Sequence, residues 1–332
     1  MASNTTPMPA NTGFDLGRFL RRNGLQVGIF SVMLLLWVIY FVSTPAFRQG
    51  NIYTALMSTV PYWGIVALPL TMLVIGREMD LSFPSIMAMS VTTFVGVNLA
   101  TGQPLLAFAA CLLTGFAVGL INGLIVVYIG IPSLIATIGT QFFWSGMVQV
   151  ITNGRSFPLN ELRGTAFRDI LVGNLFGFFP MQMIWMILVA VGVWFLLNRH
   201  RFGAHVYLIG DNENTARLMG VPVNRTRVLM FAIVGVAAAF GGLLNAIQIS
   251  NFFTNLGDGY LLIGLAAVFL GGTSVFGGVG TVFGTFIGAF IIASIQPAVV
   301  AIGWAGFTTE VIYGLIIVLS VAMHTILRAR IR

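Results

Sequence analysis

The sequence of 332 residues contains no lysine, so all sixteen of its basic residues are arginines, and it has only one cysteine and three histidines. A nucleotide-binding P-loop needs a lysine to reach the phosphates, so the chain cannot contain an ordinary Walker ATPase. Cys111 lies alone in an apolar run and excludes an internal disulfide framework, while the scattered histidines lack metal-ligand spacing. Any ATP-driven work must therefore be done by another subunit, and metal catalysis is disfavoured.

Charged residues are also scarce, at 8% of the chain against 58% hydrophobic residues. This polar surface is too small to cover a soluble globule of the same size. A helix needs about 20 apolar residues to cross roughly 30 Å of hydrocarbon. The sequence therefore predicts an all-α integral membrane protein with about ten transmembrane segments, at 25–43, 52–75, 83–100, 105–129, 132–151, 181–198, 228–249, 260–271, 281–300 and 308–327.

The arginines are distributed unevenly between the two sides of such a bundle. With a cytoplasmic amino terminus, ten crossings leave only Arg48, Arg155, Arg163 and Arg168 outside and the other twelve inside. This asymmetry satisfies the positive-inside rule and places both termini in the cytoplasm, as tails at 1–24 and 328–332 around a transmembrane domain at 25–327. The first apolar run is too long for a usual signal core and is expected to be an uncleaved anchor. The net charge of +7 thus reflects topology and not a nucleic-acid partner.

Two loops are long enough to have a function of their own. The outer loop, 152–180, mixes charged and apolar residues, and it is expected to lie along the outer interface as a short amphipathic piece or to be a simple connector. The inner loop, 199–227, is the longest hydrophilic stretch inside.

The inner loop contains the signals of one short helix. Asp211 or Asn212 can cap it, it would run through Met219, Gly220 can close it in a left-handed conformation, and Pro222 prevents its continuation. A two-turn helix is marginal in water and normally needs a partner surface. The loop is therefore predicted to be a docking element.

Glycines spaced four apart in the apolar segments allow helix backbones to approach closely in lipid. The clearest rows are Gly115, Gly119 and Gly123, and Gly280, Gly284 and Gly288. They predict a tightly packed bundle and no particular activity.

The stretch IGREMDLSFPS places Arg77, Glu78 and Asp80 between two apolar segments. Because charges are costly in hydrocarbon, this run should break the segments at the membrane edge or beside a water-filled cavity. Asp80 or Ser82 can cap the next helix, with Pro84 in its first turn. The stretch is either a charged cytoplasmic turn or an element of gating or of a partner contact.

Three motifs resemble those of a known family. REMDLS at 77–82 is similar to the family pattern GGIDLS, with Asp80, Leu81 and Ser82 kept, and FLGGTSVFGGVGTVFGTFIGA at 269–289 is similar to its LGGTS followed by a glycine-rich turn. The inner loop is similar to the pattern G-x-N-x-x-A-x-x-x-G-I, matched at Gly210, Asn212, Thr215 or Ala216, and Gly220. In their order along the chain, the three motifs resemble those of the permease subunits of ribose-type monosaccharide ABC importers. The motif residues are Asp80, Leu81, Ser82, Gly271, Gly272, Thr273 and Ser274.

The resemblance implies one of two permease subunits, identical or different, in a bacterial inner membrane. It also implies a periplasmic binding protein that delivers the solute and an ATP-binding cassette subunit that holds ATP and Mg²⁺, with no cofactor in this chain and membrane lipid around it. The inner loop would be the coupling helix on the ATPase, through Gly210, Asn212, Glu213, Thr215, Ala216, Arg217 and Gly220.

The sequence departs from the family pattern in two places. Arg77 and Glu78 stand where the family has two glycines, which turns a flexible turn into a charged one. The family's tyrosine-glutamate-leucine appears as Gly259, Tyr260 and Leu261, so the acidic side chain is missing. Both departures leave the solute open.

A sugar or polyol is neutral, so its passage needs amides, hydroxyls and aromatic faces. Two rows at helical spacing and one further amide are predicted to line it: Thr137, Gln141 and Trp144, then Asn245, Gln248 and Phe252, then Asn122. Gln296 is another intramembrane amide. Amides of this kind also serve as bonds between helices, and that alternative stays open for each residue.

Two other classes of function compete with an ATP-driven importer. An ion-coupled secondary transporter usually has acidic residues deep in the membrane, whereas here they cluster at predicted segment ends, with Glu310 as the best candidate. A membrane-embedded enzyme would need a nucleophile, a base or a metal constellation at sensible spacing, which the sequence lacks.

Overall fold

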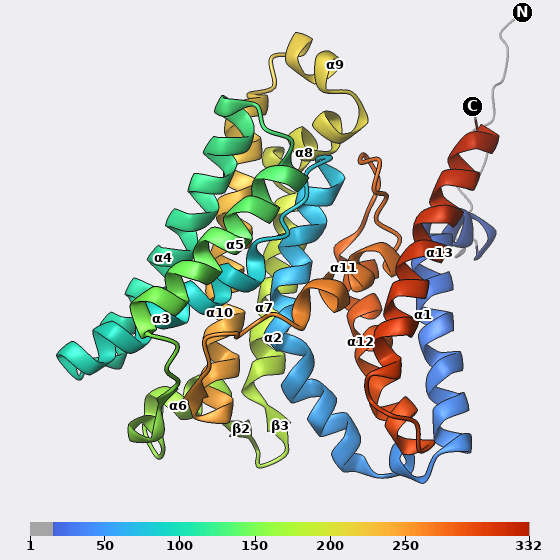
Figure 1. The fold of residues 1–332 in the computed structure, drawn as a ribbon. Helices are drawn as coiled ribbons and strands as arrows, with labels where there is room; N and C mark the ends of the chain where they lie inside the picture. Colours follow the sequence, from blue (N-terminus) through green and yellow to red (C-terminus); the bar gives the residue numbers. More distant parts are fainter. Residues whose placement is uncertain (1–15, 332) are drawn as a thin grey trace, which may run out of the picture.

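The computed structural model describes residues 16–331 as a bundle of helices (Figure 1). Eight of the described helices are long and apolar enough to cross a membrane, and the apolar parts of α11 and α13 are shorter. The predicted all-α membrane bundle is therefore confirmed. The ten helices are α1 (Leu16–Ser43), α2 (Gly50–Ile75), α3 (Phe83–Thr101), α4 (Pro104–Leu124), α5 (Ser133–Thr152), α7 (Met181–Asn198), α10 (Val223–Ile249), α11 (Tyr260–Leu270), α12 (Val282–Ala301) and α13 (Thr308–Ile331).

Short elements connect these helices. A 3₁₀ turn (Pro45–Arg48) follows α1, and a π turn (Ile125–Ile129) extends α4. The outer loop holds β1 (Phe157–Pro158), a 3₁₀ turn (Asn160–Leu162), α6 (Ala166–Val172), β2 (Asn174–Leu175) and β3 (Phe179–Pro180). β1 pairs antiparallel with β4 (Asn251–Phe252), and β2 pairs with β3. The inner loop holds α8 (Arg201–Asp211) and α9 (Glu213–Leu218).

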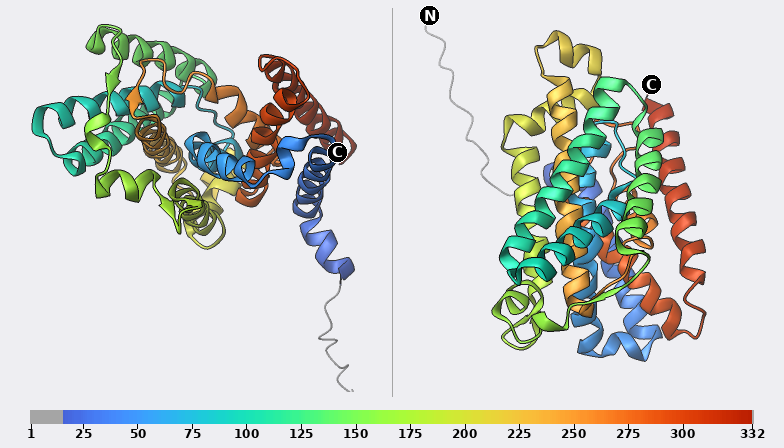
Figure 2. Two further views of the ribbon diagram at one scale, coloured as in Figure 1. Left: turned by 90° about the horizontal axis from the view of Figure 1, so that it is seen from below. Right: turned by 60° about the vertical axis from the view of Figure 1, so that its left-hand side comes forward.

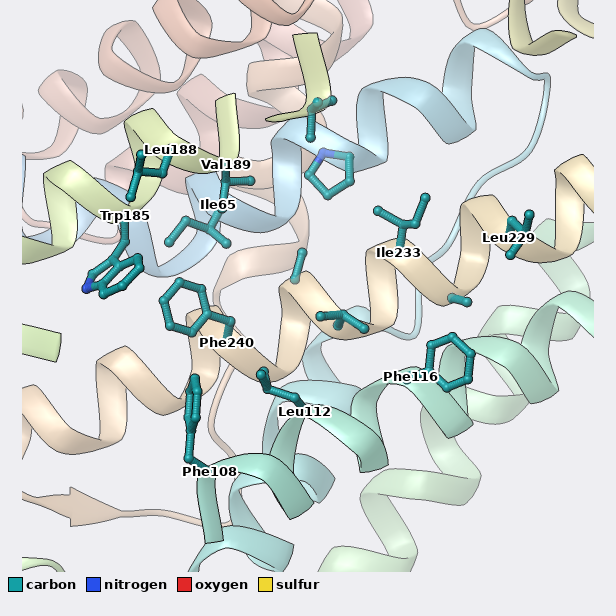
Figure 3. A pocket seen from close by; sticks show the side chains of 15 residues that line it. Ile65, Phe108, Leu112, Phe116, Trp185, Leu188, Val189, Leu229, Ile233 and Phe240 are labelled. Atoms are coloured by element: carbon teal, nitrogen blue, oxygen red, sulfur yellow. The ribbon is translucent and has the colours of Figure 1, made fainter. Parts of the chain in front are cut away.

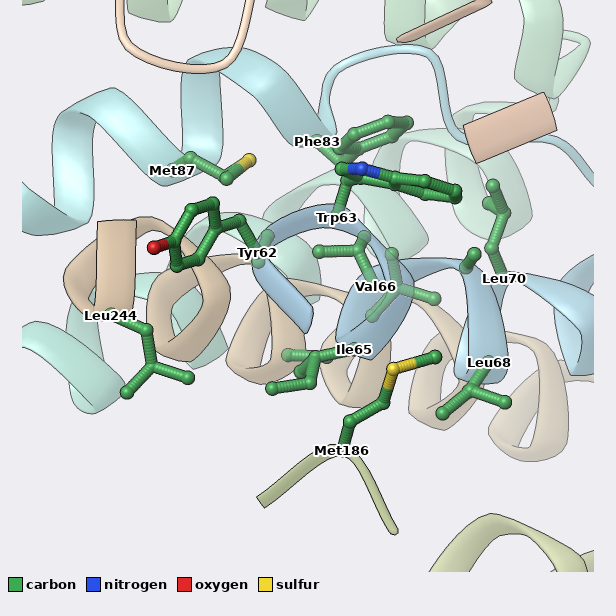
Figure 4. Packing of buried hydrophobic residues seen from close by; sticks show 14 of the residues in the cluster. Tyr62, Trp63, Ile65, Val66, Leu68, Leu70, Phe83, Met87, Met186 and Leu244 are labelled. Carbon is green, nitrogen blue, oxygen red and sulfur yellow. The ribbon is translucent and has the colours of Figure 1, made fainter. Parts of the chain in front are cut away.

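Helices α2 and α10 form the centre of the bundle, because most of each is buried by its neighbours whereas α1 and α5 are largely exposed. α2 is apolar on every side, and Figure 4 shows Tyr62, Ile65 and Leu68 projecting from it in different directions into the packed cluster. Viewed along the bundle, α3, α4 and α5 lie on one side of this centre and α1, α12 and α13 on the other (Figure 2).

The predicted glycine rows pack helices at close range. A Cβ on Gly115 or Gly119 of α4 would overlap the backbone of α10, at the carbonyl oxygens of Gly235 and Phe231. A Cβ on Gly288 of α12 would overlap the carbonyl oxygen of Ala267 in α11. Gly280 precedes α12 and belongs to the connecting loop. Close approach through small residues therefore fixes the pairs α4–α10 and α11–α12.

The described part of the chain begins and ends on the same side of the bundle. α1 begins and α13 ends on the side of the bundle that carries α8 and α9 (Figure 1), which agrees with the predicted location of both termini on one side. The first helix begins at Leu16, so helical structure covers part of the stretch predicted as a tail, and residues 1–15 and 332 lie outside the described part of the chain.

Two helices begin inside the bundle. The segment 76–82 leaves the end of α2 near α8 and runs back along α5, so that α3 starts beside Gln141, eight residues or about 12 Å into α5. α11 starts after a loop from the opposite end of α10, and Gly257 in this loop lies so close to Pro84 that a Cβ would be 3.0 Å from its Cα. The starts of α3 and α11 therefore meet in the interior.

Candidate functional site

The second half of the inner loop holds the short helix that its sequence predicted. The side-chain oxygen of Asn212 accepts a hydrogen bond from the N–H of Thr215 at 3.0 Å and caps α9. Gly220 has a left-handed φ of 78°, and α10 begins directly after Pro222. The predicted cap and stop are confirmed.

The sequence analysis missed α8, which precedes this cap. His200 caps α8 by accepting a hydrogen bond from the N–H of Phe202 at 3.1 Å. The apolar spacing of Val206 and Ile209 was the available signal. Ile209 forms a small buried cluster with Ala216 of α9 and Val223 of α10, and this cluster holds the two short helices together.

The residues predicted for coupling fall into two groups. Gly210 is buried against the end of α2, where a Cβ would overlap the carbonyl oxygen of Ile75, and Ala216 is buried between α8 and α10. Arg217 lies on the exposed side of α9 and binds Glu213 at 2.8 Å. Leu218 and Met219, which were not predicted, are 89% and 64% exposed at the tip of α9. Two adjacent large apolar residues within a hydrophilic loop were the signal for them.

A shared arginine joins α9 to the segment 76–82. One terminal nitrogen of Arg227, in α10, binds Oε2 of Glu213 at 2.7 Å, and its Nε lies 3.0 Å from Oε1 of Glu78. The second contact is an ion pair, since this Nε forms no hydrogen bond among the described residues. The Glu78 side chain is only 8% exposed.

The two carboxylates on Arg227 differ in acidity. Burial raises the pKa of Glu78, although a hydrogen bond with Ser133 and the charge of Arg227 oppose the rise. Burial also pushes the pKa of Glu213 upwards, but the hydrogen bond from Arg217 and the charge of Arg227 outweigh it, so this pKa lies below its usual value. Glu213 is therefore the more firmly ionised partner.

Arg77 connects the same segment to α8 and to the loop between α11 and α12. Its Nε donates to the carbonyl oxygen of Phe276 at 2.9 Å, and a terminal nitrogen donates to that of Asp211, the last residue of α8, at 2.6 Å. Glu78 and Asp80 of this stretch are buried. The two predicted alternatives for the stretch, a charged cytoplasmic turn and an element of gating or of a partner contact, stay open.

The start of α3 is held by polar side chains from two neighbouring helices. The N–H groups of Met79, Leu81 and Ser85 donate to the side chains of Ser133, Thr137 and Gln141, which follow one another at steps of four along α5. Two of the residues predicted to line a passage therefore bond to the backbone of 76–85. Thr137 is wholly buried.

Asp80, Ser82 and Asn122 form a buried cluster at this point. Oδ1 of Asp80 accepts hydrogen bonds from the N–H of Ser82 at 2.8 Å and from its hydroxyl at 2.6 Å, and the amide of Asn122 donates to that hydroxyl at 2.6 Å. Ser82 occupies the N-cap position of α3 but its side chain makes no capping bond, because it donates to Asp80 instead. The predicted side-chain cap is wrong, and the DLS residues instead fix the turn.

The second predicted row divides between helix contacts and packing. Asn245 donates to the hydroxyl of Tyr260 at 2.5 Å, and Gln182 donates to Gln248 at 2.8 Å, so both amides bond between helices. Phe252 is wholly buried in β4, since α10 ends at Ile249 and a left-handed Ser250 follows. Its predicted place on the helical row is wrong, and its place along a passage stays a prediction. Trp144 is half-buried on α5.

A cavity with the predicted chemistry lies elsewhere, between α2, α11, α12 and α13. It has a volume of about 370 Å³ and lies in the half of the bundle remote from α9, where α2 begins. Hydroxyls, an amide and an indole line it, from Thr59, Tyr62, Trp63, Tyr260, Gln296 and Tyr313. Tyrosines inside apolar runs were the signal for this cavity. Glu310, exposed in the first turn of α13, is not among its lining residues.

A larger groove of about 580 Å³ lies between α2, α4, α7 and α10 (Figure 3). Its walls are apolar side chains such as Phe108, Leu188 and Phe240, together with Trp185. Such walls offer a polyhydroxylated solute almost no hydrogen bonds. Its chemistry fits hydrocarbon better than a sugar.

The LGGTS motif builds the loop between α11 and α12. Gly271 packs against the backbone of Gly284, Gly272 has a left-handed φ of 83°, and Thr273 is buried. The N–H of Ser274 donates to the carbonyl oxygen of Val279 at 2.9 Å and closes the loop. The loop then reaches α2, because the N–H of Gly278 donates to the carbonyl oxygen of Ile75 at 2.9 Å. These residues are structural and bring the loop against α2 and α8.

In the described part of the chain, no group of three or more His, Cys, Asp or Glu side chains could hold a metal ion.

Comparison with known proteins identifies the family. Residues 52–321 match the family described as the permease component of branched-chain amino acid transport systems. The chain is 30% identical over 310 residues to the autoinducer 2 import system permease protein LsrD of Yersinia enterocolitica serotype O:8 / biotype 1B, across 92% of this chain and 93% of that protein. It is 28% identical to the proteins of the same name from Yersinia pestis and Yersinia pseudotuberculosis, across 92% of each chain.

These relatives are transport components and not enzymes, which agrees with the absence of a P-loop. The apolar helices and the family together confirm a multi-pass protein of the bacterial inner membrane. The family also implies an ATPase and a substrate-binding protein as partners. With most of its length matched, the chain belongs to this family and is a permease component of a sugar-type ABC importer, as its three motifs predicted.

Proposed function

We propose that this chain is one of two membrane-spanning subunits of an ATP-driven importer, and that a monosaccharide or related polyol crosses through it after delivery by a periplasmic binding protein. ATP and Mg²⁺ bind to a separate ATPase subunit, which docks on α9. The second permease subunit, identical or not, and membrane lipid cover the exposed apolar sides of the outer helices.

The observation that carries this proposal is the build of α9. A capped helix of six residues stands out at one end of the bundle (Figure 1), with Leu218 and Met219 exposed at its tip. Exposed apolar residues on an otherwise hydrophilic loop indicate a protein contact, and a helix this short gains stability from such a surface. Closure of the ATPase dimer would then move α9 and rock the bundle between outward and inward states.

The chemistry of the solute follows from the cavity of about 370 Å³. Tyrosine hydroxyls, an amide and an indole can bind and stack on a neutral ring without fixed charge. Since the relatives are named for import of autoinducer 2, that compound is the first solute to test beside pentoses, hexoses and inositols. An ion-coupled transporter working alone is the competing function, and it requires no ATPase.

The test is capture of the ATPase encoded in the same transport system. Leu218→Asp puts a charge on the tip of α9 and should lower capture at least tenfold and abolish uptake, while the protein stays inserted. The control Phe176→Asp changes an equally exposed residue, 83% exposed, in the loop between β2 and β3 at the other end. Capture that survives both Leu218→Asp and deletion of 212–219 would refute the docking assignment. Accumulation of solute by the purified chain alone in vesicles would favour the ion-coupled alternative.

A further inference from the structure

We propose that Arg77 and Glu78 clamp α9 to the start of α3, so that a displacement of α9 is passed to the half-helix inside the bundle. The two residues would be positioning residues for transport, and the inference rests on the docking role proposed for α9. Arg77, Glu78 and Arg227, which joins Glu78 to α9, are called the clamp below.

The first half of the clamp consists of the two ion pairs that Arg227 makes. Arg227 lies between two carboxylates, Glu213 in the first turn of α9 and Glu78 in the segment leading to α3, at 2.7 and 3.0 Å. The side chains of Arg227 and Glu78 are 17% and 8% exposed, so water competes little for their contact, whereas Glu213 is 33% exposed. Arg227 therefore holds Glu213 of α9 and Glu78 against the same point of α10.

The other half of the clamp is built around Arg77. Its guanidinium binds the carbonyl oxygen that ends α8, where a positive charge also interacts favourably with the helix dipole, and it binds the carbonyl oxygen of Phe276. Arg77 adopts φ 65°, a conformation that ordinarily favours glycine. Beneath it, a Cβ on Gly277 would overlap Cγ of Arg77. The left-handed turn at Arg77 and the lack of a side chain at Gly277 thus leave room for the Arg77 side chain.

The clamp continues directly into the segment that positions α3. The segment up to residue 82 carries no helix of its own, and its N–H groups bond to Ser133 and Thr137 on α5. In the first turn of α3, the N–H of Ser85 bonds to Gln141, one turn further along α5. Asp80 and Ser82 bind each other and Asn122 of α4. A displacement applied at Glu78 therefore reaches the first turn of α3 through continuous bonded contacts.

The clamp is also specific to this sequence within the pattern it resembles. Glycines at positions 77 and 78 would keep the left-handed turn and lose both the guanidinium and the carboxylate contacts. The double variant Arg77→Gly/Glu78→Gly therefore removes the clamp without straining the backbone, because glycine favours the φ of residue 77.

The experiment measures motion and transport separately. In a Cys111→Ala background, a nitroxide at position 218 of the isolated permease in lipid nanodiscs should become more mobile in the Arg77→Gly/Glu78→Gly variant. In the complete complex, solute transported per ATP should fall at least fivefold while ATPase capture stays within twofold. The control is Arg225→Gln, an exposed arginine of α10 two positions before Arg227.

Two conservative variants distinguish loss of the clamp from misfolding. Glu78→Gln is nearly isosteric and should reproduce most of the loss, whereas Glu78→Asp keeps the charge and should restore at least half of the transport per ATP. Wild-type transport per ATP in both the double variant and Glu78→Gln would overturn the clamp even if the nitroxide is loosened. Capture that does not depend on α9 would instead overturn the proposed docking role, so the two failures are distinguishable.

Discussion

The helices α3 and α11 begin next to each other inside the bundle, but different interactions hold them. Three side chains of α5 accept hydrogen bonds from the backbone at the start of α3, and Asn122 adds a fourth contact. α11 is packed on α12 at Gly288, and the side-chain hydroxyl of its first residue, Tyr260, accepts a hydrogen bond from Asn245.

This difference has a mechanical consequence. Two helices whose backbones pack this closely would clash if one shifted against the other, so α11 is expected to move only together with α12. Directional hydrogen bonds on a segment without regular structure can be exchanged for others or for water at modest cost. We therefore expect α3 to be the mobile member of the pair and α11 the fixed one.

The largest effect is expected from breaking the packing of α11. Gly288→Leu places a side chain on the carbonyl oxygen of Ala267 and should cost roughly 3 kcal/mol of folding free energy. Thermal unfolding of the detergent-solubilised protein, followed by size-exclusion chromatography, measures this loss. The control is Gly192→Leu on α7, where a Cβ meets nothing within 4 Å. Equal midpoints for the two variants would show that α11 is not held by this contact.

A smaller loss is expected when one bond to the start of α3 is removed. Thr137→Val keeps the shape of the side chain and leaves the N–H of Leu81 without its acceptor, which should cost about 2 kcal/mol. Thr140→Val is the matched control, because the hydroxyl of Thr140 bonds only within α5 among the described contacts. Indistinguishable melting of Thr137→Val and Thr140→Val would mean that water replaces the lost acceptor.

The parts of this fold that the sequence predicted are those with local signals. The lengths of the apolar runs located the helices, and the cap at Asn212 with the stop at Gly220 located α9. The partners of Glu78 could not be predicted in this way. Arg227 follows in a distant helix, and no local pattern records that α10 would bring it beside the turn after α2.

The candidate passage shows a second limit. A polar residue in an apolar run must be satisfied, but a bond to another helix and contact with a solute satisfy it equally well. Asn245 and Gln248 bond to other helices, whereas Gln296 lines the cavity together with tyrosines from three helices. Only the packing of all the helices distinguishes the two outcomes.

Removing the hydroxyl of Tyr260 tests how much of the stability of α11 depends on a hydrogen bond. Tyr260→Phe loses the bond with Asn245 and should cost about 1 kcal/mol, less than Thr137→Val, because packing carries most of the stability of α11. Since Tyr260 also lines the cavity, the KM for uptake should rise while capture of the ATPase is unchanged. Tyr53→Phe, which loses a bond to the carbonyl oxygen of Phe47 outside the cavity lining, is the control for KM. An unchanged KM would remove Tyr260 from the solute site.

The smallest effect is expected from pH, and it acts on α3 alone. The pKa of Glu78 is raised above 4.5, so its carboxylate is protonated first as the pH falls, whereas the pKa of Glu213 is lowered and it remains ionised below that value. Ionised Glu78 costs stability at neutral pH and that cost disappears on protonation, while the stability contributed by Glu213 is present above 4.5 and is lost only below it. Arg227, Glu213 and Ser133 are the groups that face Glu78.

At a pH between the two pKa values, Arg227 keeps its ion pair with Glu213 of α9 and loses its ion pair with Glu78, which frees the segment leading to α3. A nitroxide at position 81 should therefore gain mobility as the pH falls through the raised pKa of Glu78, by about a few tenths of a kcal/mol, and Glu78→Gln should show the high mobility throughout the titration. A titration shared by wild type and Glu78→Gln would show that Glu78 is not the group responsible.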